Sequence, residues 1–264
     1  MGFRDSGMKL KKSELKEFLD EKVELYNRAS FIESDPISIP HQYNKKEDIE
    51  IAGFLAATIS WGNRKMIIKN ANRIMAMLDY SPFEFIMNSN DDEFDSLGSF
   101  VHRTFNSTDL SYFLKALQHI YKYKGGLENI FNTHQTSDSL QHAIHELHKI
   151  FFELPHEKRT EKHLSDPYKG SSAKKLNMYL RWMIRKDNKG VDFGIWDSIS
   201  PSILSCPLDV HSGNVARKLG LLKHKQNDAR AVTELDTVLR SFDDKDPVKY
   251  DFALFGLGAI DKFI

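Results

Sequence analysis

The stretch Pro207-Leu208-Asp209-Val210-His211-Ser212-Gly213-Asn214-Val215-Ala216-Arg217-Lys218-Leu219-Gly220-Leu221 has the pattern of a capped helix. Val210, Val215 and Leu219 recur near one helical face, and the glycine after Leu219 stands where helices commonly end. Asp209 occupies the N-cap position, so its carboxylate is placed to accept from unpaired amide groups of the first turn. The simplest interpretation is that Asp209 is a structural cap. The second, that it also lines a cleft and takes part in chemistry, depends on the rest of the chain.

The composition sets limits on the class of protein. The chain has 264 residues, 41% of them hydrophobic, which suits one large domain or two small ones. It contains no apolar run of about 18 residues, and its first residues, Met1 to Lys12, are polar and basic. The single cysteine, Cys206, excludes an intramolecular disulfide framework and the usual cysteine-ligated zinc or iron–sulfur sites. We therefore expect a cytoplasmic protein with no membrane span, signal peptide, metal or other cofactor.

Charge is distributed unevenly along the chain, although the formal net charge is zero. Between residues 155 and 189 there are ten Lys or Arg residues and four Asp or Glu residues. A neutral chain argues against indiscriminate binding of nucleic acids, for which a basic surplus is typical. The local surplus is nevertheless compatible with one basic face.

The spacing of apolar residues predicts helices along most of the chain and no strand longer than four residues. The expected helices, nine or ten in number, cover residues 13–30, 48–60, 65–78, 81–87, 108–124, 138–152, 173–184, 209–219, 228–239 and 247–264. In one of them, His142, His145 and His148 recur at three-residue steps. Since they cannot all face one ion and no carboxylate joins them, we interpret them as a solvated face. The predicted fold class is all-α.

A second candidate for chemistry is the lysine pair Lys174-Lys175, which follows the turn Lys169-Gly170-Ser171-Ser172. Such a turn at a helix start presents backbone N–H groups to an anion such as a phosphate. A lysine there lies near the positive end of the helix dipole, which makes its neutral amine easier to reach. A neutral amine is a nucleophile that forms a Schiff base with a sugar C1′. Two surface lysines on a basic helix are the simpler interpretation.

The pairing of this lysine with the later aspartate resembles the site of the helix-hairpin-helix (HhH-GPD) DNA glycosylase superfamily. Residues 207–221 resemble the segment that carries the catalytic aspartate of that superfamily, and the likeness runs from about residue 48 to the end. Residues 55–78, 121–131 and 254–258 resemble three further segments. The spacing of 35 residues (209 minus 174) is nearest to the archaeal 8-oxoguanine glycosylase branch. The whole chain also resembles a conserved bacterial family of unknown function.

This sequence departs from the superfamily pattern at two motifs. The usual glycine-rich hairpin is replaced by residues 166–174, with one glycine, and the usual glutamine pair by Ser60-Trp61. The resemblance implies an all-α fold with two helical subdomains and a cleft between them. We expect an N-terminal helical extension over residues 1–47 and the glycosylase-like domain over residues 48–264.

The same resemblance implies the function and the site. It implies a monomeric DNA-repair glycosylase, possessing lyase activity if Lys174 is its nucleophile, that binds double-stranded DNA and flips out a damaged purine. Asp209 would stabilise the developing sugar cation, and Lys175 is the alternative nucleophile. The expected DNA contacts are Gly170, Ser171, Ser172, Arg181, Arg185, Arg217 and Lys218. The expected base pocket comprises Trp61, Asn63, Arg64, Phe193, Trp196 and His211, with Trp182 as a further candidate for stacking.

Two other functions fit the same sequence. A non-catalytic nucleic-acid-binding protein would keep the fold and salt-dependent duplex binding without any reaction. An all-α structural or partner-binding protein would use Asp209 only as a helix cap and would not bind DNA.

Overall fold

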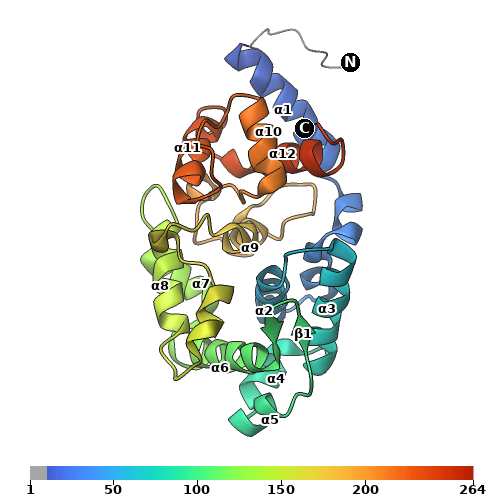
Figure 1. Ribbon diagram of the computed structural model, residues 1–264, viewed down its shortest axis with the longest axis vertical. Helices are drawn as coiled ribbons and strands as arrows, with labels where there is room; N and C mark the ends of the chain where they lie inside the picture. Colours follow the sequence, from blue (N-terminus) through green and yellow to red (C-terminus); the bar gives the residue numbers. More distant parts are fainter. Residues whose placement is uncertain (1–10, 264) are drawn as a thin grey trace.

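The computed structural model describes residues 11–263, and this part of the chain is almost entirely helical (Figure 1). It contains twelve α-helices, and its only strands are the two-residue β1 (Val101–His102) and β2 (Phe105–Asn106) of one antiparallel hairpin. The helices are α1 Lys12–Tyr26, α2 Lys46–Thr58, α3 Arg64–Met77, α4 Pro82–Asn88, α5 Asp91–Asp95, α6 Ser107–Tyr123, α7 Gly126–His134, α8 Gln141–Phe151, α9 Lys174–Ile184, α10 Val210–Lys218, α11 Ala229–Arg240 and α12 Tyr250–Ala259. The all-α prediction is confirmed.

Short 3₁₀ turns connect these helices. They are η1 Ala29–Ser34, η2 Pro36–Ser38, η3 Pro40–Gln42, η4 Lys158–His163, η5 Pro167–Lys169, η6 Pro201–Ile203 and η7 Pro247–Lys249. Five of the seven begin with a proline, whose fixed φ favours the first helical position.

The buried apolar side chains form two clusters. The C-terminal core is built by α1, α10, α11 and α12, with Leu19, Val215, Leu235 and Leu254 fully or almost fully buried. The central core is built mainly by α2 to α9 and is rich in aromatic rings. In Figure 1 the first group of helices occupies the upper part of the molecule, α2 to α8 occupy the lower part, and α9 lies between them.

The N-terminal helix α1 is part of the C-terminal core and does not form a separate extension. Leu15, Leu19 and Val23 pack in that core. The ring of Tyr26 lies so close to Gly256 of α12 that a Cβ at this glycine would have no room. A division at residue 47 would therefore cut α1 from the helices it packs against. The helix expected from residue 13 begins at Lys12, and the Glu14 carboxylate accepts from the Lys11 amide at 2.8 Å.

Two short helices were not expected from the sequence. Residues 88–99 lie outside the helices expected from the sequence, but they contain α5, in which Asn90 and Glu93 cap one another. Gly125, with φ of +77°, ends the previous helix and also precedes α7. In both places the polar or glycine-rich composition masked a helix, because the capping residues themselves are turn formers.

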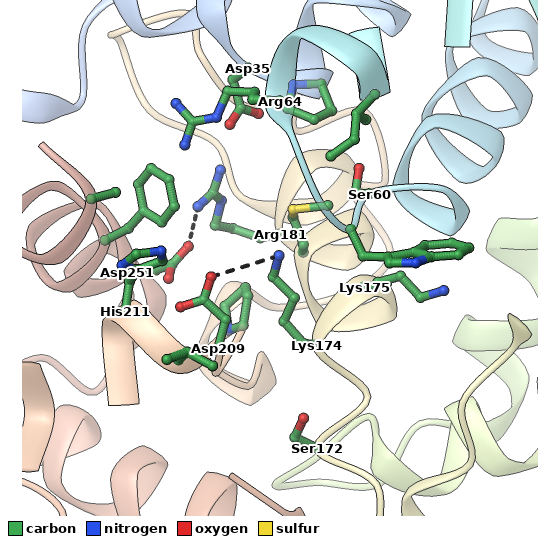
Figure 2. A pocket seen from close by; sticks show the side chains of 18 of the residues that line it. Asp35, Ser60, Arg64, Ser172, Lys174, Lys175, Arg181, Asp209, His211 and Asp251 are labelled. Atoms are coloured by element: carbon green, nitrogen blue, oxygen red, sulfur yellow. Dashed lines mark hydrogen bonds and ion pairs between the residues drawn. The ribbon is translucent and has the colours of Figure 1, made fainter. Parts of the chain in front are cut away.

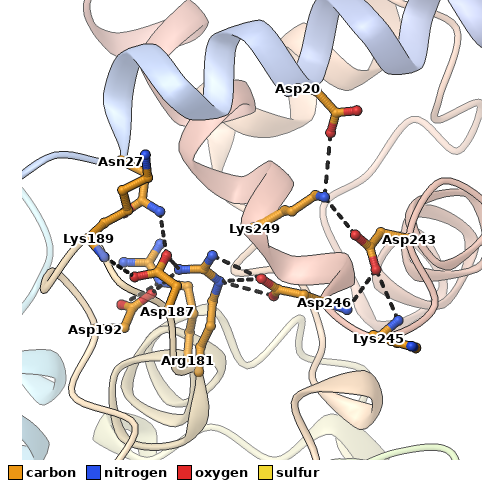
Figure 3. A network of polar contacts seen from close by, with 11 residues as sticks. Asp20, Asn27, Arg181, Asp187, Lys189, Asp192, Asp243, Lys245, Asp246 and Lys249 are labelled. Carbon is orange, nitrogen blue, oxygen red and sulfur yellow. Dashed lines mark hydrogen bonds and ion pairs between the residues drawn. The ribbon is translucent and has the colours of Figure 1, made fainter.

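A buried ion-pair cluster fastens α9 to the C-terminal half of the molecule (Figure 3). Arg181 pairs with Asp192 at 3.2 Å and with Asp251, while Arg185 pairs with Asp192 at 3.0 Å and with Asp246 at 2.9 Å. Both guanidinium groups are at most 4% exposed. Arg181 and Arg185, which the sequence predicts as DNA contacts, thus already have buried carboxylates around their charges.

Candidate functional site

A cavity of about 560 Å³ is lined by residues of α3, α9, α10 and α12 and by the segment before η2. Its lining residues come from α9 and from both groups of helices, and Figure 2 shows their side chains. Nine residues singled out in the sequence line it: Trp61, Arg64, Ser171, Ser172, Lys174, Lys175, Arg181, Asp209 and His211. A cavity of this volume is in the usual range for a small-molecule or nucleotide-sized ligand.

Lys174 and Asp209 face one another across this cavity. The Lys174 Nζ atom lies 3.9 Å from Asp209 Oδ2, and the two side chains are 29% and 22% exposed. Figure 2 shows the amine and the carboxylate pointing toward each other from α9 and from the start of α10. The separation is longer than a hydrogen bond, so the amine is not locked to the carboxylate. The pair is thus open to a ligand on its cavity side.

Asp209 is both a helix cap and a cavity residue. Its Oδ1 atom accepts from the Ser212 amide at 2.9 Å, and the Ser212 hydroxyl accepts from the Asp209 amide at 2.9 Å. The Asn227 side chain donates to the Asp209 carbonyl at 2.8 Å. Because one carboxylate oxygen is used for the cap, Oδ2 is fixed in position toward Lys174.

The turn before α9 reverses the chain with residues in the left-handed region. Gly170 has φ of +89° and Ala173 has φ of +47°. Ala173 is fully buried and occupies the N-cap position without a side chain to cap the first turn. Its backbone conformation is strained for a residue with a Cβ. The free amide groups at the start of α9 lie beside Lys174, Ser171 and Ser172, an arrangement suited to an anion.

Lys175 points away from Asp209 and is held inside the central core. Its amine donates to the Thr58 carbonyl at 2.7 Å and to the His163 carbonyl at 3.1 Å. It also lies 4.7 Å from the centroid of the Trp61 ring. Two carbonyls and one aromatic face satisfy all three N–H groups of an ammonium ion. Burial, with a smaller contribution from the charge of Lys174, lowers the pKa of Lys175 to about 7.

The burial of Lys175 predicts a pH-dependent stability. The folded-state pKa of Lys175 lies below its ordinary value of 10.5, so below pH 7 the amine is charged in both states and its buried charge destabilises the folded protein. Between pH 7 and pH 10.5 the folded protein holds a neutral amine while the unfolded chain is still protonated. The unfolding free energy therefore increases as the pH rises through this range. We expect the unfolding free energy of the wild type relative to Lys175→Met to increase by about 3 kcal/mol between pH 6 and pH 9. Urea unfolding of both proteins at the two pH values measures this difference. A difference independent of pH would contradict it.

Three predicted pocket residues do not line the cavity. Trp196 is fully buried between Phe131 and Tyr179 and donates to Glu50 at 2.6 Å. Phe193 lies against His41, with ring centroids 4.3 Å apart. Asn63 caps α3 by accepting from the Met66 amide at 3.2 Å. Trp182 is also fully buried. These side chains pack or cap, because tertiary contacts rather than local pattern decide which way they point.

Three other predicted DNA contacts, Arg217 and Lys218 on α10 and Gly170 before α9, do not line the cavity. The Arg217 guanidinium donates to the carbonyls of His224 and Gln226 and to the Asn227 side chain, at 2.7 to 3.1 Å. It is therefore occupied in fixing the following loop. Lys218 is exposed and lies over the Phe263 ring, at the end of α10 opposite to Asp209. Gly170 is exposed but does not line the cavity.

The sequence profile of a family described as "Protein of unknown function (DUF2400)" matches residues 35–260. The chain belongs to this family. Comparison with curated proteins and with solved structures returns no match. The matched region of this DUF2400 protein covers every residue that lines the cavity except Phe31.

Sequence reasoning did not identify several cavity residues of this DUF2400 protein. Phe31 lies in the 3₁₀ turn η1 and Asp35 between η1 and η2, where the sequence has no periodicity. Asp251 and Phe255 come from an almost uniformly apolar helix. Asp251 is paired with Arg181, and burial raises its pKa to about 6. The only local signal for Asp35 was the proline that follows it, which marks a helix start but no ligand.

Residues 11–263 lack two features, a metal-binding cluster of side chains and a helix that could span a membrane. No group of three or more His, Cys, Asp or Glu side chains is arranged to hold a metal ion. In that range, no helix has both the length and the apolar character needed to cross a bilayer.

The three histidines of α8 have separate environments: His145 pairs with Asp166 at 3.1 Å, His142 contacts Tyr168, and His148 is buried. The interpretation of all three as a solvated face is wrong for His148.

Proposed function

We propose that this protein is a DNA base-excision glycosylase with an associated lyase activity, in the manner of the HhH-GPD superfamily. The observation that carries the proposal is the approach of Lys174 and Asp209, 35 residues apart in the sequence (209 minus 174), to 3.9 Å within a cavity. A nucleophilic amine and a carboxylate in one cleft are the two groups that this chemistry requires. The geometry favours Lys174 over Lys175 as the nucleophile, because the Lys175 amine is occupied by two carbonyls.

The proposed reaction begins when Asp209 Oδ2 takes a proton from the Lys174 ammonium and leaves a neutral amine. The amine nitrogen donates its electron pair to C1′ of the flipped nucleotide, and the base departs with the electrons of the glycosidic bond and with the proton that Asp209 took, which restores the carboxylate. The carboxylate stabilises the positive charge that develops on the sugar. Opening of the sugar ring then gives an imine between Nζ and C1′.

The imine makes strand cleavage possible. Loss of a proton from C2′ sends an electron pair toward the imine and breaks the bond from C3′ to its phosphate oxygen, so that the phosphate leaves as an anion. Water then hydrolyses the imine and regenerates the amine. Borohydride instead reduces the imine to a stable amine that links the protein to the DNA.

The surroundings of the pair support a nucleotide as the ligand. A base must leave the duplex before its glycosidic carbon can be reached, and the cavity volume is sufficient for it. Trp61 lies at the wall, held from behind by the Lys175 amine and by the ring of His163 with a centroid distance of 6.0 Å. Ser171, Ser172 and the uncapped start of α9 offer donors to a phosphate.

The direct test is borohydride trapping on a duplex that carries one abasic site. We expect a covalent complex between the wild-type protein and the DNA, seen as a slower band on a denaturing gel, because an abasic site already presents C1′ to the amine. No complex on the abasic duplex would remove the lyase activity. Base release from duplexes containing 8-oxoguanine or uracil then tests a glycosylase without lyase activity.

The same preparation also tests the competing functions. Duplex binding that weakens steeply with salt, without base release or trapping, would identify a non-catalytic nucleic-acid-binding protein. Absence of salt-dependent duplex binding would leave Asp209 as a helix cap in a protein of another function.

A further inference from the structure

Asp35 lines the cavity, and the reaction proposed above does not use it. The residue is 7% exposed, and Figure 2 shows its carboxyl group next to Arg64 at one end of the cavity. Its Oδ1 atom accepts from the Ile37 amide at 3.1 Å and caps the turn η2. Within residues 11–263, the other carboxyl oxygen has no hydrogen-bond donor and Asp35 forms no ion pair. A buried carboxylate with an unused oxygen is costly, so it indicates a ligand that supplies a donor.

Arg64, the cation with the largest electrostatic effect on Asp35, also has no carboxylate partner within residues 11–263. Arg64, Arg181 and Lys174 all favour the charged form of Asp35, but burial outweighs them and raises its pKa. Arg181 is already paired with Asp192 and Asp251, and Lys174 faces Asp209. Arg64 forms no ion pair with residues 11–263, and its guanidinium lies 4.9 Å from the Phe255 ring centroid.

Two aromatic rings complete this end of the cavity. Phe31 and Phe255 both line it and meet edge to face, with centroids 6.0 Å apart and planes at 83°. Together the four side chains offer one hydrogen-bond acceptor, a set of donors and two apolar surfaces. A planar heterocycle with an N–H group beside an acceptor atom matches all of these features.

We propose that Asp35 is a specificity-determining residue that reads the hydrogen-bonding edge of the flipped base. Its unused oxygen accepts from an N–H group of the base, and Arg64 donates to a neighbouring carbonyl oxygen or ring nitrogen. Phe31 and Phe255 cover the apolar surface of the ring. This inference rests on the proposed glycosylase function and places the base between α3, α12 and the segment at residues 31–36. This proposed position of the base differs from the one expected from the sequence, in which Phe193 and Trp196 lined the base pocket.

The variant Asp35→Asn isolates this role. Asparagine keeps the oxygen that caps η2 and replaces the unused oxygen with an amide that donates, so the fold is retained while the acceptor is lost. We expect single-turnover base release from an 8-oxoguanine or uracil duplex to fall about 10- to 100-fold. Borohydride trapping on an abasic duplex should remain within about twofold of the wild type, because that substrate has no base to read. Glu33→Gln, an exposed carboxylate on the same segment, is the matched control and should change neither reaction.

The outcomes separate Asp35 from the function on which it rests. If both reactions fall in parallel, Asp35 acts on Lys174. If base release is unchanged, Asp35 does not recognise the base. Either result overturns the proposal. If the wild type shows no chemistry on any duplex, the proposed function fails instead. Fluorescence anisotropy then still tests Asp35: a loss of affinity of about tenfold confined to base-bearing duplexes supports the assignment, and equal affinities overturn it.

Discussion

Lys174→Gln is expected to abolish the borohydride-trapped adduct with an abasic duplex, with a loss of at least about 1000-fold. An amide nitrogen is not a nucleophile, and no other amine points at Asp209 Oδ2 in the part of the chain that the structure describes. The side chain is 29% exposed and its contact with Asp209 is long, so the melting temperature should be almost unchanged. Loss of the adduct with an intact fold would therefore report chemistry rather than unfolding.

Two further lysine variants control this experiment. Lys169→Gln removes an exposed lysine from the same turn and should leave the adduct intact. Lys175→Gln removes the buried neighbour, and its melting curve separates an effect on folding from one on chemistry. An adduct that survives Lys174→Gln and disappears in a folded Lys175→Gln would assign the nucleophile to Lys175. That result would also require the Lys175 amine to leave the carbonyls of Thr58 and His163.

Asp192→Ala is expected to destabilise the protein by about 3–5 kcal/mol, the largest effect on stability that we predict. Asp192 is 5% exposed and pairs with both Arg181 and Arg185. Removing its carboxylate leaves the two buried guanidinium groups with one fewer negative charge to balance them. Urea unfolding measures the free energy, and the melting temperature should fall by about 10 °C or more.

The neighbouring pair Lys186–Asp197 provides the control for that experiment. It is formed by the same stretch of chain, but its side chains are 68% and 79% exposed. Asp197→Ala should therefore change stability by less than about 1 kcal/mol. Equal losses of unfolding free energy in Asp192→Ala and Asp197→Ala would show that burial of the cluster does not account for its contribution to stability.

Local signals were sufficient to predict the helix that carries Asp209. The cap, the apolar spacing and the terminating glycine all act within a few residues, and the structure places α10 at Val210–Lys218 with Gly220 at φ of +74°. The starts of α3 and α11 lie within one residue of the predicted positions 65 and 228, and in the structure Asn63 and Asp228 cap these helices. The approach of Lys174 to Asp209 is a tertiary contact, and only the family resemblance indicated it.

The residues that sequence reasoning misplaced depend on distant partners. Arg181 and Arg185 lie on a basic amphipathic helix, which is typical of a solvent-facing surface. Their carboxylate partners come from residues 187–192, 246 and 251, so their burial is invisible to any local pattern. Phe31 belongs to the 3₁₀ turn η1 and Asp35 lies between η1 and η2, and the spacing of such turns does not distinguish a cavity wall from a surface.

The consecutive lysines at the start of α9 have an evolutionary consequence. One side chain projects into the cavity and the next into the central core, and neighbouring helical positions differ by about 100° of rotation. Inserting or deleting a single residue between Gly170 and Ala173 would tend to rotate one lysine toward the place of the other. Related chains that retain the site should therefore tolerate substitutions in this turn far better than changes in its length.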